Sequence, residues 1–319
     1  MKLAAFEAQG RARWDRFAAL LAALERGDGA GASELPALYR QVCHDLALAR
    51  ERQLSGALVA ELNELALFGH RLLYQARTGE WRGLGAFLAR DFPRAVRGEW
   101  RLVLGLHALF YGLALALAVL AWAHPELIYS FVDPANVSEI ESMYDPSGAI
   151  ATEPRGAEAD ATMFGYYIWN NVSIAFRTYA SGLALGVGTL VSVIFNGLYF
   201  GLIASHLVRE GSAQPFFSFV IGHSAFELTA ILLSGVAGMR LGLAVLAPGP
   251  RSRVSALRAA ARSSLPITAG TALMLLIAAG IEAFWSPRHV PAEVKYAVGA
   301  LLWLLVALWL GAAGRSRAD

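Results

Sequence analysis

The sequence predicts an all-α, polytopic membrane protein with five or six spans and a cytoplasmic N-terminal helical domain. Of its 319 residues, 56% are hydrophobic and only 16% are charged, whereas soluble domains carry about 45–50% and about 25%. The mean hydropathy is +0.46, and several apolar runs are long enough to cross a bilayer as helices. This composition excludes a disordered chain and a purely soluble enzyme. The charged residues are distributed unevenly along the chain, which indicates membrane topology and no nucleic-acid partner.

The first 101 residues are expected to form the cytoplasmic domain. Apolar residues recur at helical spacing in three stretches, 6–24, 38–48 and 58–73, which predicts three helices. A fourth helix begins near Trp81 and carries four arginines, which are Arg90, Arg94, Arg97 and Arg101. Arginines directly before an apolar run are typical of an anchor at the cytoplasmic face.

The first membrane span is predicted at residues 102–123, where His107 is the one ionisable residue among 22. The segment that follows, 124–163, contains eight acidic residues and one basic residue, Arg155. Because basic flanks remain on the cytoplasmic side, we expect this acidic loop outside and both termini inside. The expected location is therefore the bacterial cytoplasmic (inner) membrane. The proline and glycine content of the loop predicts an irregular path, with a short helix around 137–143.

Residues 164–314 are expected to form a membrane helical bundle. Two spans are clear, at 265–284 and 294–310, because basic residues flank the pair on both sides. Three further apolar stretches lie at 164–181, 183–207 and 216–246. Three crossings there give six spans in total. The alternative places 164–181 in the interface as an amphipathic helix and makes 216–246 a re-entrant hairpin broken near Gly222.

Polar side chains at membrane depth are the candidate site residues, because they are costly in hydrocarbon. The set comprises His223, Glu227, Glu282, Asn170, Asn171, Asn196 and Arg177. His223 and Glu227 are four residues apart, so they share one helical face. The pair can share a proton, bind a divalent ion together with Glu282, or satisfy each other's hydrogen bonds. We expect the two glutamates and His223 to approach one another in the bundle interior. The sequence names no metal and indicates no cofactor.

Small residues four apart form a second pattern within the apolar runs. The three steps are Gly182 to Gly186, Gly197 to Gly201, and Gly238 to Gly242. Such steps let helix backbones approach closely in lipid. They serve packing within one chain or contact between two copies. We expect a homodimer or larger assembly in the lipid bilayer, with Gly197 to Gly201 as the preferred contact.

These residues, taken in order, resemble the stage II sporulation protein M family. The matching residues are 170–176, Gly182, Gly186, 188–189, 196–197, Gly201, 222–228, 235–238, 248–249, Arg253 and 281–284, together with 38–40, 45–47, 49–50 and 62–63 in the N-terminal domain. The resemblance implies a polytopic membrane protein. It also implies partners that remodel peptidoglycan, because the namesake assembles with the sporulation proteins that degrade the wall. The resemblance carries over no catalytic residue.

The predicted function is that of a non-enzymatic membrane scaffold, acting by resemblance in remodelling of the cell envelope. The alternative is a channel or transporter for an ion or small solute whose pathway uses the buried polar residues. The two differ in a structural property. A scaffold keeps such residues paired and dry, whereas a pathway needs a cavity that reaches them.

Overall fold

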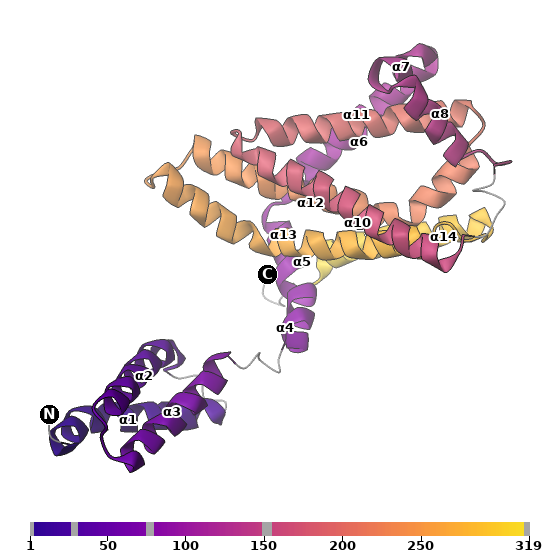
Figure 1. The fold of residues 1–319 in the computed structure, drawn as a ribbon. Helices are drawn as coiled ribbons and strands as arrows, with labels where there is room; N and C mark the ends of the chain where they lie inside the picture. The colour runs from indigo at the N-terminus through magenta and orange to yellow at the C-terminus, as the bar shows by residue number, and fades with distance from the viewer. Residues whose placement is uncertain (1–2, 27–30, 75–79, 149–154, 316–319) are drawn as a thin grey trace. The chain divides into compact units, whose positions relative to one another are not determined.

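The computed structural model describes residues 3–26, 31–74, 80–148 and 155–315, and within these ranges it contains helices and no strand. The predicted all-α, multi-pass fold is confirmed. The chain divides into two compact units, 1–83 and 84–319. Figure 1 shows the helices of both units in chain order.

The first unit is built from three helices around one apolar core. They are α1 (Leu3–Glu25), α2 (Leu35–Glu51) and α3 (Gly56–Tyr74), with a short 3-10 turn, η1 (Ala32–Glu34), before α2. Trp14, Phe17 and Leu62 are completely or almost completely buried in this core. Trp14 Nε1 also donates a hydrogen bond of 2.8 Å to the buried Asp45 carboxylate. All three helices agree with the helical spacing of the sequence.

The second compact unit begins at residue 84, before the boundary at residue 101 that the sequence predicts. Residues 84–98 lie in α4 (Glu80–Ala86), the π-helical turn η2 (Phe87–Asp91) and α5 (Phe92–Gly98). Phe92 is fully buried, and its ring centroid lies 5.2 Å from that of Trp309 in the last helix. Arg97 Nη1 donates to the Leu310 carbonyl at 3.0 Å. The arginine-rich segment is therefore part of the membrane unit, because its apolar face packs there.

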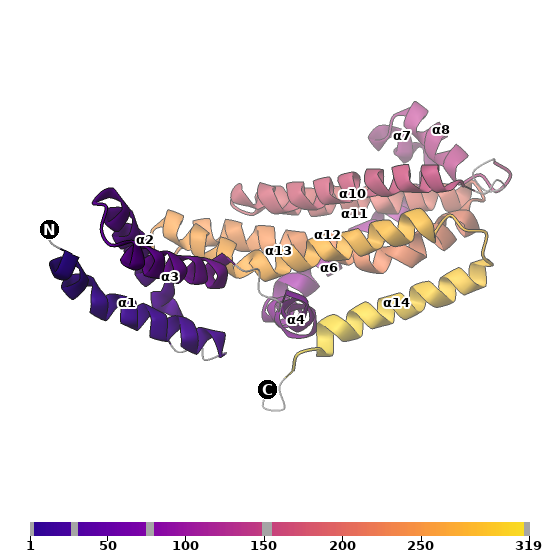
Figure 2. The ribbon, with the colours of Figure 1, turned by 60° about the horizontal axis from the view of Figure 1, so that its bottom comes forward.

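Five described helices are long and apolar enough to cross a membrane. They are α6 (Trp100–Ala123), α11 (Val187–Arg209), α12 (Ala213–Leu246), α13 (Arg253–Phe284) and α14 (Ala292–Ala312). A further long helix, α10 (Ala157–Ala180), packs against α11, α12 and α13. In Figures 1 and 2, these four helices run side by side.

The direction of α6 and α11 makes α10 a sixth crossing of the bundle. Gly201 packs on Ala114, and Ser205 Oγ donates to the Ala118 carbonyl at 2.9 Å. In each pair the two residues are separated by 87 positions in the sequence. The contact therefore advances towards the C-terminus along both helices, so α6 and α11 are parallel. The chain therefore leaves α6 at one end of the bundle and enters α11 at the other. Among the described residues between them, α10 is the element long enough to return, at about 36 Å.

Helix α12 is the centre of the unit and packs against α6, α10, α11, α13 and α14. It is continuous from Ala213 to Leu246, so the interpretation as a re-entrant hairpin broken near Gly222 is wrong. Gly222 stays helical and serves a different purpose. A Cβ at this position would lie 3.0 Å from the Trp285 ring, so the glycine lets the end of α13 pack closely on α12.

The acidic segment folds into a cap at the C-terminal end of α6. It contains η3 (Pro125–Leu127), α7 (Ile128–Phe131) and α8 (Pro134–Met143). Buried Ile128, Val132 and Val137 pack with residues of α6 and α11 in one cluster. The short helix predicted around 137–143 is the second half of α8. More of this segment is helical than its composition suggests, because its apolar residues reach the bundle.

The glycine steps pack helices of the same chain against one another. A Cβ on Gly182 would meet the Gly238 backbone, and a Cβ on Gly242 would meet Gly186. Gly197 and Gly201 lie against the α6 backbone at Phe110 and Ala114. The expectation that the step from Gly197 to Gly201 joins two copies is therefore wrong, because α6 already fills that face.

Candidate functional site

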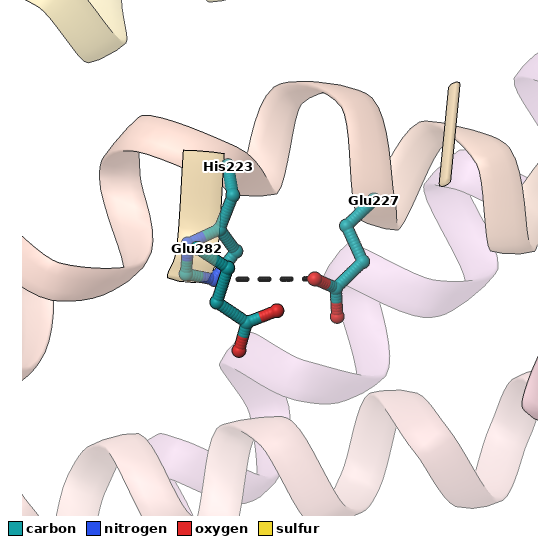
Figure 3. Close-up of side chains that lie close together, drawn as sticks. All are labelled: His223, Glu227 and Glu282. Carbon is teal, nitrogen blue, oxygen red and sulfur yellow. Dashed lines mark ion pairs between the residues drawn. The ribbon is translucent and has the colours of Figure 1, made fainter. Parts of the chain in front are cut away.

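A histidine and two glutamates meet near the end of the bundle that carries the cap. His223 and Glu227 project from α12, and Glu282 projects from α13. One ligand atom from each residue lies within 4.8 Å of the others. Figure 3 shows the three side chains together, with the Glu282 carboxylate close to both His223 and Glu227. We call this group the carboxylate site.

Local structure explains why these side chains converge. His223 and Glu227 are one helical turn apart and share the face of α12 that α13 covers. Glu282 lies in the last turn of α13, close to the contact between Trp285 and Gly222. Directly after this helix, the fully buried Ser286 places its Oγ 3.2 Å from His223 Nδ1. The Ser286 carbonyl accepts a hydrogen bond of 2.7 Å from Lys295 Nζ, which holds the turn in place.

His223 is buried and the two glutamates are partly buried, and one oxygen of each glutamate is unsatisfied. His223 is 5% exposed, and its Nε2 lies 3.9 Å from Glu227 Oε2, which is too long for a hydrogen bond. Glu227 Oε2 and Glu282 Oε2 are both buried without a hydrogen-bond partner. Such groups cost free energy when they are left unpaired in an apolar interior. The interpretation in which the pair merely satisfies its own hydrogen bonds therefore does not describe this geometry.

Further polar groups surround the two carboxylates. The Asn171 amide, on α10, approaches both of them, although its Nδ2 atom is also buried without a partner. The Arg155 guanidinium lies near Glu282 and beside the Tyr167 hydroxyl. Tyr144 covers the site from the end of α8. Burial raises the pKa of the Tyr144 phenol, and the nearby Glu282 carboxylate raises it further.

Sequence reasoning missed Arg155 and Tyr144. The signal that could have identified Arg155 is its position as the one basic residue of an acidic segment. A single cation among eight acidic residues suggests a specific carboxylate partner. Tyr144 carried no comparable signal. It occupies its position because its ring packs on Phe216 and Phe219 of α12.

Three of the predicted site residues lie outside the carboxylate site. Asn170 supports it indirectly, since its Nδ2 donates to Asn171 Oδ1 at 3.0 Å. Asn196 Nδ2 donates to the Ser192 carbonyl in its own helix, at 2.8 Å. Arg177 is exposed, and its Nε donates to the Ser173 carbonyl one turn before it. Asn171 therefore turns towards the site, whereas the other two amides and the arginine do not. The rotation of each helix within the bundle decides this, and spacing along the sequence does not reveal it.

The chemistry available at the carboxylate site follows from its donor set. One imidazole nitrogen and two carboxylate oxygens are ligands for zinc and related divalent cations. Two neighbouring carboxylates can alternatively share a proton. No cysteine contributes, because Cys43 belongs to the first unit.

A second ionic group lies at the opposite end of the bundle. Arg240, near the end of α12, forms an ion pair with Glu99 and donates to Ser263 Oγ at 3.0 Å. These side chains border a cavity of about 890 Å³, which Arg101 and Arg251 also line. In contrast to the carboxylate site, Glu99 and Arg240 are each other's direct partner. We call this group the paired site.

Comparison with known proteins matches both parts of the chain. The family described as Stage II sporulation protein M matches residues 106–287, which is more than half of the sequence and includes the carboxylate site. A domain of unknown function, DUF8413, matches residues 4–75. The uncharacterized protein MJ0793 of Methanocaldococcus jannaschii is 26% identical over 127 residues, covering 39% of this chain and 71% of that protein. No solved structure matches.

Proposed function

The chain belongs to the stage II sporulation protein M family, and we propose that it is a non-enzymatic membrane scaffold that assembles proteins of the cell envelope. The observation that carries this proposal is the separately folded N-terminal unit. It has its own core, and the chain connects it to a membrane bundle whose helices pack closely at glycine residues. A folded domain tethered to a closely packed membrane bundle suits recruitment of a partner better than turnover of a substrate.

The N-terminal unit also offers a surface for such a partner. A cavity of about 480 Å³ is lined by Trp14, Leu67, Phe68 and residues around them. Leu67 is 55% exposed, and acidic Glu61 and Glu64 border the same cavity. An apolar hollow with a charged rim is typical of protein contact surfaces. We propose that envelope-remodelling proteins bind here or at the cap.

The proposal places the protein in the bacterial cytoplasmic membrane, with both termini in the cytoplasm and the cap outside. The segregation of acidic and basic residues supports this orientation. The proposal also includes self-association in the bilayer. Self-association would use helix faces other than the glycine steps, because those steps are filled within one chain.

Photo-crosslinking of the full chain in its native membrane tests the scaffold proposal. A crosslinking amino acid at Leu67 should capture one protein of defined mass, whereas Arg40, exposed on α2, serves as the matched position outside the cavity. A product that forms at Leu67 and not at Arg40, and that mass spectrometry identifies as an envelope protein, supports the proposal. Equal or absent crosslinking at both positions contradicts it.

The unsatisfied carboxylate site favours one other function, the transport of an ion. Buried charged groups in membrane helices are typical of ion pathways. Purified protein in liposomes provides the test. Cation or proton flux that Glu227→Gln abolishes would favour transport over the scaffold, whereas flux equal to that of empty liposomes would exclude it.

A further inference from the structure

We propose that His223, Glu227 and Glu282 bind a divalent transition-metal cation, of the zinc or manganese class, at the cap-bearing end of the bundle. The site joins α12 to α13, and Asn171 connects it to α10. This inference is independent of the scaffold proposal. It assigns a ligand to a group of side chains and does not depend on which protein binds the chain.

The distances fit a shared metal better than a direct hydrogen bond. Zinc lies about 2.0–2.1 Å from a histidine nitrogen and about 2.0–2.2 Å from a carboxylate oxygen. Two donors on one metal are therefore roughly 3.3–4.2 Å apart, depending on the angle between the bonds. The distance of 3.9 Å from His223 Nε2 to Glu227 Oε2 falls within this range. Glu282 contributes an oxygen within 4.8 Å of both atoms, so a small side-chain rotation completes the set.

The imidazole is already held in the orientation that a metal requires. Its Nδ1 atom lies 3.2 Å from Ser286 Oγ, while its Nε2 atom faces the carboxylates. When Nδ1 donates to an outer partner, Nε2 keeps its lone pair for a cation. The Phe219 ring, edge-on at a centroid distance of 5.5 Å, restricts rotation of the imidazole. Ser286 and Phe219 thus fix the ligand without occupying its metal-binding nitrogen.

Unpartnered buried atoms provide an observation that is independent of the acidic pair. Asn171 is only 2% exposed, yet its Nδ2 atom has no partner while its amide approaches both carboxylates. A cation would satisfy Glu227 Oε2 and Glu282 Oε2 and would draw their second oxygens into fixed positions. Asn171 Nδ2 is then placed to donate to one of those second oxygens, as outer hydrogen bonds commonly do around metal ligands.

Arg155 provides a test in which the proposal predicts the direction of the change in metal affinity. Its guanidinium lies near Glu282, so it partly neutralises the carboxylate and repels an incoming cation. Removing that charge without removing a ligand should therefore tighten metal binding. If Arg155 were instead the structural ion-pair partner of Glu282, its removal would leave the carboxylate without a nearby cation and would lower the stability of the protein.

The first experiment uses the full chain in nanodiscs after treatment with a chelator. We expect titration with zinc chloride or manganese chloride to give one high-affinity equivalent per chain. X-ray absorption at the zinc edge should show one imidazole nitrogen and a remainder of oxygen ligands. The absence of a stoichiometric equivalent, or coordination by two or more imidazoles, would overturn the proposal. Two imidazoles would indicate binding at surface histidines.

Variants then assign the binding to these residues. We expect Glu282→Gln and His223→Gln to weaken the affinity for zinc by at least about 10-fold. The matched controls are Glu139→Gln on the exposed face of α8 and His107→Gln in α6, and they should leave the affinity unchanged. Arg155→Gln should strengthen it by about threefold or more.

The Arg155 variant keeps the proposal testable even if a ligand variant does not fold. It removes no metal ligand, so its folded form should be obtainable when the others are not. Weaker or unchanged zinc binding in Arg155→Gln contradicts the proposal. Equal affinity in wild type, Glu282→Gln and the control variants would likewise place the bound metal elsewhere.

Discussion

The carboxylate site and the paired site lie near opposite ends of the same helices but differ in how their charges are satisfied. At the paired site, Glu99 meets Arg240 directly, and Arg240 also reaches Ser263. At the carboxylate site, Glu227 and Glu282 face each other with unpartnered oxygens. This partly buried ion pair needs no ligand, because each charge already has its partner. Unpaired buried carboxylates instead indicate a position where a ligand supplies the missing partner.

This difference has a consequence for how the two groups respond to substitution. Removing one member of the paired site leaves a partly buried charge without its partner, so the free energy of unfolding should fall. Replacing a glutamate of the carboxylate site by glutamine removes an unsatisfied carboxylate. In the absence of a ligand, the free energy of unfolding should therefore rise or remain unchanged. The following predictions test this contrast, beginning with the largest expected effect.

The bundle ends that carry the carboxylate site and the paired site are expected on opposite sides of the membrane. Ser142, in the cap, and Ser255, near the start of α13, are the two positions chosen to report on them. In a background with Cys43→Ser, we expect Ser142→Cys to react with an impermeant thiol reagent added to intact cells, and Ser255→Cys to react after lysis alone. Labelling of Ser255→Cys in intact cells, with Ser142→Cys protected, would reverse the proposed orientation. Labelling of both would contradict the six-crossing arrangement.

The parallel contact of α6 and α11 holds the two ends apart, so breaking it should disrupt the whole unit. A Cβ at Gly201 would overlap the Ala114 carbonyl oxygen. We expect Gly201→Leu to reduce the free energy of unfolding by about 3 kcal/mol, with loss of a monodisperse size-exclusion peak. Gly112→Leu is the matched control, because no atom lies within 4 Å of a Cβ there. A well-folded Gly201→Leu protein with weakened self-association would instead restore the step as a contact between copies.

Several parts of this fold could be predicted from sequence, and the reasons are local. Hydropathy and length identify the spans, because these properties belong to single helices. The spacing of His223 and Glu227 is enough to place both side chains on one helical face. The approach of Glu282 follows from the cost of leaving it in lipid. Each of these inferences uses either neighbouring residues or a single energetic penalty.

The parts that could not be predicted depend on how helices are oriented about one another. Asn171 joins the carboxylate site while Asn196 and Arg177 do not, because rotation of each helix decides which face turns inward. The parallel direction of α6 and α11, and hence the crossing by α10, rests on contacts 87 residues apart. Gly222 suggested a break in α12, but its lack of a side chain accommodates Trp285. In a sequence, a glycine is equally compatible with a break in a helix and with a close contact between two helices.

Removing Arg240 tests the paired site. The Glu99 side chain is only 20% exposed and Arg240 about one-third, so solvent screens the pair in part. We expect Arg240→Met to lower the free energy of unfolding by about 1–3 kcal/mol, measured by denaturant titration in detergent. Adding Glu99→Gln to this variant should recover most of the loss. Arg251→Met, at an exposed arginine of the same cavity, is the control, and an equal loss there would contradict a specific role for the pair.

The most direct measurement is thermal unfolding of wild type and Glu227→Gln, each with and without zinc. Without metal, we expect Glu227→Gln to unfold at the same temperature as wild type or a few degrees higher, because an unpartnered carboxylate has been replaced by a neutral amide. Zinc at 100 times its dissociation constant should stabilise wild type by about 2.7 kcal/mol and should leave the variant nearly unchanged. The wild type should therefore have the higher unfolding temperature when zinc is added. A variant that unfolds well below wild type without metal, with neither protein responding to zinc, would show that the carboxylate site is an ordinary structural pair.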